Sequence, residues 1–81
     1  MMEDKIKGKD IIGKTVVSKE GRRFGLVGDV TFDPGTGELL NIVLTSPTQY
    51  AKNILGTELR VSFTAVVSLG DFVIVSEEDL V

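Results

Sequence analysis

Apolar and polar residues alternate along most of this chain, and the alternation predicts short β-strands. The longest such stretch runs from Phe24 to Gly37, where Leu26, Val30 and Phe32 fall on one face at period two, with Gly28 completing the row. A turn at the end of this stretch leads into a second alternating segment. We therefore expect a long strand followed by a return strand.

Six short strands are expected in total, at close spacing. Their ranges are 15–18, 23–33, 38–44, 58–63, 66–69 and 72–75. Gly25 and Gly28 lie inside the second strand, where glycine indicates a bulge or a sharp bend. Short strands with glycine-bearing turns predict an all-β fold, a small six-stranded, mostly antiparallel barrel.

Glycine and proline mark the turns. Asp33-Pro34 opens a turn that glycines can complete, because they tolerate the positive φ that such turns need. Gly70-Asp71 is typical of a two-residue hairpin. The residues expected to serve turn or bend geometry are Gly28, Asp33, Pro34, Gly35, Gly37 and Gly70.

The predicted core takes the inward-facing residues of these strands. It comprises Val17, Leu26, Val30, Phe32, Leu40, Ile42, Leu59, Val61, Phe63 and Val66. In the third strand the opposite face carries Leu39 and Val43, and is more apolar than a solvated face requires. This second apolar face makes Leu39 and Val43 candidate interface residues.

The connection at 45–57 is the one stretch inside the module without strand character. Ser46 is placed as an N-cap, Pro47 at the first helical position, Gln49 where a capping box wants Glu or Gln, and Gly56 beyond the end. A helix this short is marginal unless it packs on something. The residues therefore leave two alternatives, a short helix within 46–55 or a flexible loop.

Three apolar residues of this connection, Tyr50, Ile54 and Leu55, are candidates for protein contact. Apolar side chains on a connection either fold down over the open end of the barrel or face a partner. An aromatic residue with aliphatic neighbours has the large area and the few rotatable bonds that an interface anchor needs. Both alternatives stay open at this point.

Composition bounds the domain organisation. The 81 residues allow one domain, and without cysteine neither disulfides nor thiolate metal sites can stabilise it. Oligomerisation is the remaining common way to stabilise a domain of this size, so a homodimer is expected. We expect a flexible N-terminal tail at 1–9, the domain at 10–76 and an acidic tail at 77–81. With no signal peptide or membrane span, a cytoplasmic location is expected.

The residues speak against catalysis and against nucleic-acid binding. The chain has no His and no Cys, the commonest general bases and thiol nucleophiles, so a small hydrolase is disfavoured and no cofactor is expected. Asp29, Asp33 and Glu38 cluster around one hairpin, but turn and solvent roles account for them better than a catalytic or metal role. A net charge of −3 with scattered basic residues speaks against direct nucleic-acid binding.

Three pieces of sequence, in this order and spacing, resemble one known family. They are Gly13–Val17, then Gly21–Val30 with Phe32–Gly37, and finally Val61–Val66 with Gly70–Val75. Together they resemble the PRC-barrel family, small β-barrels named for the photosynthetic reaction centre H subunit and also found in a bacterial ribosome maturation factor. The resemblance spans Asp10 to Ser76, nearly the whole chain.

The resemblance implies a protein-binding or dimerising module without catalytic residues. The short, acidic, stand-alone form is similar to archaeal members, some of which resemble adaptors in cell division. The alternative is a ribosome- or RNA-processing-associated factor that binds a ribosomal protein, as the ribosome-linked members do. Nothing in these residues chooses between the two roles.

Overall fold

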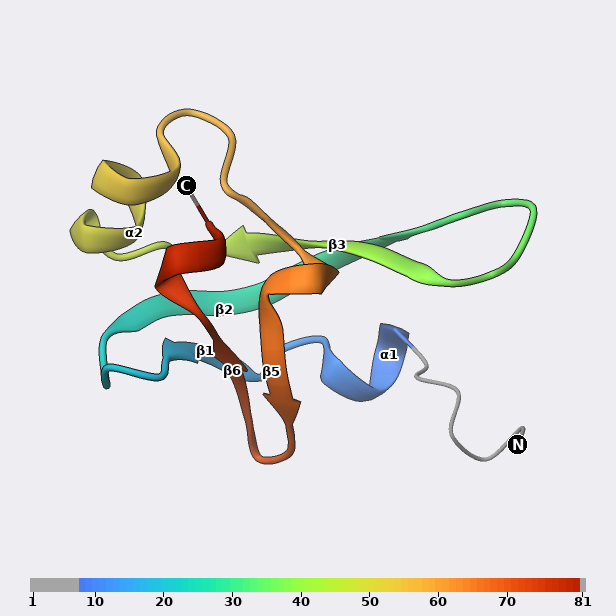
Figure 1. Cartoon of the computed structure of the whole chain (residues 1–81), viewed down its shortest axis with the longest axis horizontal. Coiled ribbons are helices and arrows are strands. Elements are labelled where there is room, and N and C mark those ends of the chain that lie inside the picture. The colour runs from blue at the N-terminus through green and yellow to red at the C-terminus, as the bar shows by residue number, and fades with distance from the viewer. Residues whose placement is uncertain (1–7, 81) are drawn as a thin grey trace.

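The computed structural model describes residues 8–80 and places six β-strands in one sheet, which confirms the expected all-β class (Figure 1). The strands are β1 (Thr15–Ser18), β2 (Arg23–Phe32), β3 (Leu39–Thr45), β4 (Arg60–Ser62), β5 (Val66–Leu69) and β6 (Phe72–Val75). The helical elements are α1 (Gly8–Ile11), α2 (Gln49–Leu55) and the 3₁₀ turns η2 (Phe63–Ala65) and η3 (Glu77–Asp79). Within the described residues, none of these helices has the length and apolar character needed to cross a membrane.

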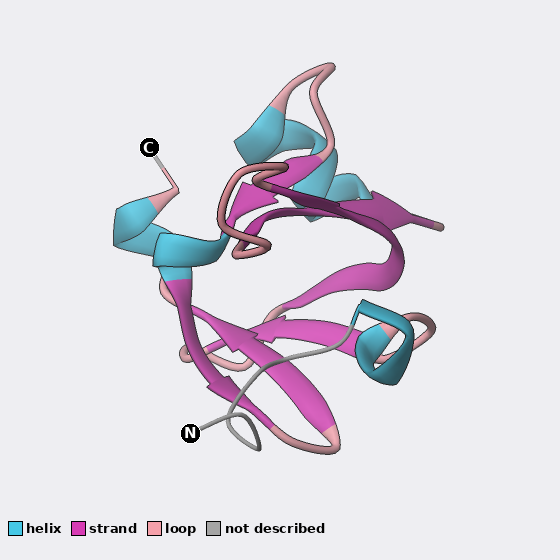
Figure 2. Cartoon of the chain, turned by 90° about the vertical axis from the view of Figure 1, so that its right-hand side faces the viewer, coloured by secondary structure: helices cyan, strands magenta, loops and turns pink. Residues whose placement is uncertain are grey.

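The strands follow the order β4-β3-β2-β1-β6-β5 across the sheet, so β4 and β5 form its edges. β1 and β6 run parallel, and the other neighbouring pairs of described strands are antiparallel. The sheet curls back on itself (Figure 2), and η2 leads directly from one edge strand to the other. Because β4 and β5 are not neighbours in the sheet, the sheet has the curvature of the expected barrel but does not close.

The β2–β3 hairpin is the longest feature of the molecule, and its turn projects beyond the rest of the sheet (Figure 1). Residues 32–40 are termed the arm. Phe32 pairs with Leu39 at the base of its turn. The pairing of β3 with β4 ends at Asn41, so the arm extends past the edge strand.

Strand pairing is irregular at four points, each with one extra residue on one strand; Val67 is the extra residue of β5 opposite β6. Phe24 is the extra residue of β2 opposite β1, Gly28 is the extra residue of β2 opposite β3, and Leu40 is the extra residue of β3 opposite β2. The bulge expected within the second strand is therefore confirmed. An extra residue shifts the following side chains to the other face of the sheet.

Glycine is required at Gly25 and Gly28 because the chain entering α2 crosses β2 there. Gly25 has φ +145°, and a Cβ on it would lie 3.0 Å from both the Pro47 Cα and the Thr45 carbonyl oxygen. A Cβ on Gly28 would lie 2.8 Å from the Thr45 Cβ. These approaches are closer than side chains tolerate, so the two glycines let the connection lie against the strand.

The bulges and the projecting arm change the predicted core. Ile42 and Val61 are buried as expected, and Val30, Leu59, Phe63 and Val66 are partly buried against the core. Phe32 and Leu40 were placed in the core wrongly, since 40% and 42% of their surfaces are exposed, and Val17 and Leu26 are only half-buried. The buried apolar residues are Ile11, Val16, Phe24, Val27, Leu39, Ile42, Leu44, Ala51, Val61, Ala65, Val73 and Val75.

The connection at 45–57 contains the short helix, α2, rather than a flexible loop. Its N-cap is Thr48, whose Oγ1 accepts a hydrogen bond from the Ala51 N–H (3.1 Å), so the expectation of Ser46 as N-cap was wrong. The Thr48 hydroxyl also donates to the Arg23 carbonyl oxygen (2.8 Å), which ties the helix start to β2. Gly56 ends the helix at φ +70°, as expected.

Short described elements lie on both sides of the expected domain bounds of 10–76. α1 begins at Gly8, within the tail expected at 1–9, and residues 1–7 lie outside the described residues. At the other end, η3 falls in the expected acidic tail, and Leu80 packs against the core. Residue 81 also lies outside the described residues.

Candidate functional site

The turn at the tip of the arm is held together by the side chain of Asp33. Its Oδ1 accepts hydrogen bonds from the backbone N–H groups of Gly35 (2.7 Å) and Thr36 (3.1 Å). The Gly37 N–H donates to the Asp33 carbonyl oxygen (2.7 Å), and Gly37 has φ +78°. Pro34 is exposed within the turn. Oδ1 of Asp33 therefore serves the turn itself.

Gly70 and Gly28, the other two turn candidates, lie in different surroundings. Gly70 lies between β5 and β6, where its N–H donates to the Phe72 carbonyl oxygen (3.1 Å). A Cβ on Gly70 would meet nothing within 4 Å, whereas a Cβ on Gly28 would meet the Thr45 side chain. Close packing therefore requires glycine at position 28, but it does not at position 70.

The carboxylates of the β2–β3 hairpin do not converge on one point. Asp29 Oδ1 accepts a hydrogen bond from the adjacent Val30 N–H (2.8 Å), Asp33 holds the turn, and Glu38 is exposed. Within residues 8–80, no group of three or more His, Cys, Asp or Glu side chains is placed to hold a metal ion. We derive no metal chemistry from these residues.

Tyr50 of α2 points inward and connects three segments. Its ring lies edge-on to the Phe24 ring, with the centroids 5.6 Å apart and an interplanar angle of 84°. The Arg22 guanidinium carbon lies 4.8 Å from the Tyr50 ring centroid, within cation–π range. The Tyr50 hydroxyl donates a hydrogen bond to Glu77 Oε1 of η3 (2.5 Å). Tyr50 therefore joins the helix to the β1–β2 turn and to the C-terminal segment.

The hydrogen bond couples the protonation of Tyr50 and Glu77. It is the main cause that holds the pKa of Glu77 below its usual value, and the charge of Arg22 acts in the same direction while burial opposes it. The same bond is the main cause that raises the pKa of Tyr50; burial adds to the increase, and Arg22 opposes it. At neutral pH a neutral phenol donates to a charged carboxylate, which is a structural pairing.

The five residues expected at an interface are not strongly exposed in this chain. Leu39 is 9% exposed and belongs to the core, so its placement on an outward face was wrong. Val43 is half-buried, and Tyr50, Ile54 and Leu55 are half-buried against the core. This arrangement corresponds to the first of the two alternatives, in which the connection folds down over its own sheet. An interface role for the four half-buried residues stays a prediction.

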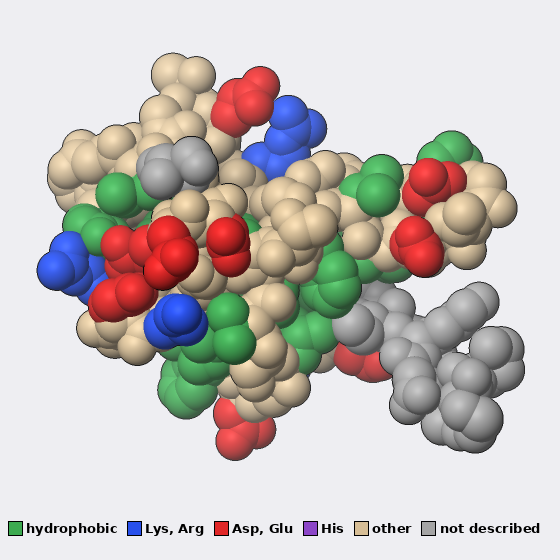
Figure 3. Space-filling model, in the orientation of Figure 1, with side chains coloured by type: hydrophobic (Ala, Val, Ile, Leu, Met, Phe, Trp, Pro, Cys, Tyr) green, Lys and Arg blue, Asp and Glu red, His purple; other side chains and the backbone are tan. Residues whose placement is uncertain are grey.

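Large exposed apolar side chains occur at other positions. The sequence pattern did not identify these residues as surface residues. Phe32 and Leu40 lie on the arm, while Val67 (57% exposed) and Phe72 (51% exposed) lie on the β5–β6 hairpin, and Ile12 follows α1. Figure 3 shows hydrophobic surface along that hairpin and towards the arm. The sequence offers a sign for two of them, because Val67 and Phe72 flank the Gly70-Asp71 turn.

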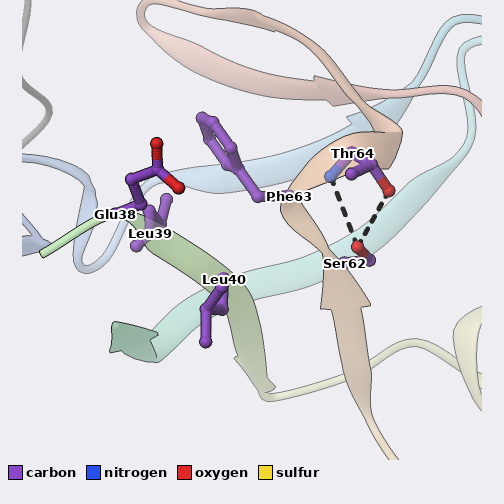
Figure 4. A pocket seen from close by; sticks show the side chains of 6 residues that line it. All are labelled: Glu38, Leu39, Leu40, Ser62, Phe63 and Thr64. Atoms are coloured by element: carbon purple, nitrogen blue, oxygen red, sulfur yellow. Dashed lines mark hydrogen bonds between the residues drawn. The ribbon is translucent and has the colours of Figure 1, made fainter. Parts of the chain in front are cut away.

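Two hollows lie against β3 and β4. One, of about 460 Å³, is lined by Glu38, Leu39, Leu40, Ser62, Phe63 and Thr64. The other, of about 500 Å³, is lined by Val43, Leu44, Thr57, Glu58, Leu59 and Arg60. The first lies where the arm leaves the sheet (Figure 4) and is termed the arm hollow. It combines the exposed Leu40 and the half-buried Phe63 with one carboxylate, a composition suited to peptide contact rather than to catalysis.

The fold and these surfaces define a small, open, mostly antiparallel β-domain with exposed apolar hairpins. The family model of the PRC-barrel domain matches residues 3–80, nearly the whole chain. The chain therefore belongs to the PRC-barrel domain family, which is a non-catalytic, interaction-type family often involved in protein–protein interaction. No curated protein matches the sequence significantly.

Proposed function

We propose that this protein is a non-catalytic adaptor that binds another protein and forms a homodimer in the cytoplasm. Its family supports an interaction role. The observation that carries the proposal is the exposure of large apolar side chains, Phe32, Leu40, Val67 and Phe72, on two hairpins of a domain of 8.8 kDa. Exposed apolar groups gathered on projecting elements are typical of association sites.

We place the proposed homodimer contact at β5, because it is an uncharged edge strand with an exposed valine at its bulge. β5 lies at the end of the sheet and pairs only with β6 among the described strands. Val67 is its most exposed apolar side chain, and no charged residue lies within β5. An uncharged edge strand pairs readily with a second copy.

Sedimentation equilibrium of the wild type and of Val67→Lys tests this proposal. We expect a dimer for the wild type at micromolar concentrations and a monomer for Val67→Lys, because a charge at the centre of an edge strand opposes pairing. Glu78→Lys, which changes an exposed charge on η3, is the matched control and should stay dimeric. A wild type that sediments as 8.8 kDa at high micromolar concentration would remove the homodimer.

The cellular assembly is proposed from the family resemblance alone. The leading role is an adaptor in an archaeal cell-division or other assembly; binding of a ribosomal protein is the alternative. Chemical cross-linking in the native host, followed by purification of the tagged chain and mass spectrometry, distinguishes them. Recovery of a ribosomal protein as the main adduct would reject the leading role.

A further inference from the structure

Where the arm leaves the sheet, β3 has no paired strand among the described residues on its β4 side, and η2 lies across the hollow from it. β4 pairs only with Asn41, Ile42 and Val43 of β3 and ends at Ser62, after which η2 leads the chain away. Leu39 and Leu40 continue β3 beyond that point without a β4 partner. A strand edge with unpaired main-chain groups accepts an added extended segment, as in β-strand addition.

The side chains around this free edge form the arm hollow. In Figure 4 the Phe63 ring and the Glu38 carboxylate lie on one side of β3, and the Leu40 side chain points to the other. Side chains of a strand alternate between the two faces of a sheet. A segment added here would therefore place alternate side chains against Phe63 and Glu38 on one face, and the side chains between them against Leu40 on the other.

The charge around the arm hollow selects among possible segments. Among the residues that line the hollow, Glu38 is the charged one, and the arm that carries it also holds Asp33 and contains no Lys or Arg. Arg60, the basic residue of β4, is already paired with Glu58 (3.1 Å). Glu38 is exposed at the rim of the hollow with no ion pair among the described residues. The complementary segment carries positive charge.

We propose that the arm hollow binds an extended segment of another protein, in which aliphatic residues alternate with Lys or Arg, as an added strand on β3. The proposal rests on the proposed adaptor function and names the chemistry of its partner. A second copy is disfavoured as the occupant, because a two-fold contact at this hollow would bring one acidic arm against the other.

The test titrates the ¹⁵N-labelled full chain with three capped heptapeptides, which alternate Val with Lys, with Glu or with Ser. We expect the Val/Lys peptide to shift the amide signals of Leu39, Leu40 and Thr64 and to bind more tightly than the other two. Glu38→Gln should weaken its binding about two- to fivefold, the size of one exposed ion pair. Leu40→Thr should weaken binding of all three peptides about fourfold or more. Asp71→Asn, in the β5–β6 turn, is the matched control and should change nothing.

Each other outcome overturns the inference. Equal binding of the Val/Glu peptide removes the charge selection, and shifts confined to α2 or to the β5–β6 hairpin move the site elsewhere. The same amide shifts on concentrating the chain alone would make a second copy the occupant. In these cases the adaptor function stands if the cross-linking experiment in the host still captures a partner. If neither the peptide titration nor the cross-linking in the host detects a partner, the proposed function itself is rejected.

Discussion

Replacing Phe24 by Ala and, separately, Phe32 by Ala tests which part of β2 contributes to the core. Phe24 is 0% exposed and contacts the Tyr50 ring, whereas Phe32 is 40% exposed on the arm. Truncating a fully buried Phe costs about 3–5 kcal/mol. For 81 residues a total stability of about 4–12 kcal/mol is expected. Phe24→Ala should therefore remove a large share of the stability, and Phe32→Ala only about 1–2 kcal/mol.

The assay is urea unfolding followed by circular dichroism, at a protein concentration held constant across variants because association adds to apparent stability. If Phe24→Ala does not fold, Phe24→Leu keeps the comparison open, with an expected loss of about 1–2 kcal/mol. The slope of the transition should stay unchanged, so that midpoints report stability. A larger loss at Phe32→Ala than at Phe24→Ala would refute this placement of the core.

Three further predictions concern the close contacts around α2. Gly25→Ala should destabilise by about 1–3 kcal/mol, because φ is +145° and the added Cβ meets backbone at 3.0 Å; Gly70→Ala, with open space, should be nearly neutral by thermal melting. Tyr50→Phe should lower stability at pH 7, because it removes the hydrogen bond to Glu77. The pKa of Glu77 is lowered in the folded state, so the stabilisation from this hydrogen bond is present above about pH 4.5 and is lost as the pH falls through the folded pKa. The stabilities of wild type and variant should therefore converge in acid. A constant difference down to pH 2 would contradict this. Thr48→Ala should cost about 1 kcal/mol through the lost N-cap, and an unchanged urea midpoint would reject the cap.

The sequence was sufficient to predict the strands and the turns. Alternation located all six strands within a few residues of their observed bounds, and Gly25 with Gly28 indicated an irregular second strand. The end of the helix at Gly56 also followed from local chemistry. These features depend on neighbouring residues, so a local pattern contains them.

The core faces and the contacts of the candidate site could not be predicted in the same way. A single extra residue at Gly28 or Leu40 reverses which side chains face inward, and alternation alone does not show where that residue falls. Leu40 was assigned inward for this reason, whereas Phe32 is exposed because it lies on the arm, beyond the end of the β3–β4 pairing. The Tyr50–Glu77 hydrogen bond joins residues 27 positions apart, a separation at which the sequence pattern carries no information.

The most direct test of the interaction function is photo-cross-linking from the arm in cells of the native host. Phe32, exposed on the arm, is replaced by the photoreactive residue p-benzoylphenylalanine, and Glu78, exposed on η3, is replaced in the same way as the matched control. The adaptor function predicts one or a few discrete protein adducts from position 32 and none of these from position 78. No protein adduct from position 32, or the same adducts from both positions, would contradict it.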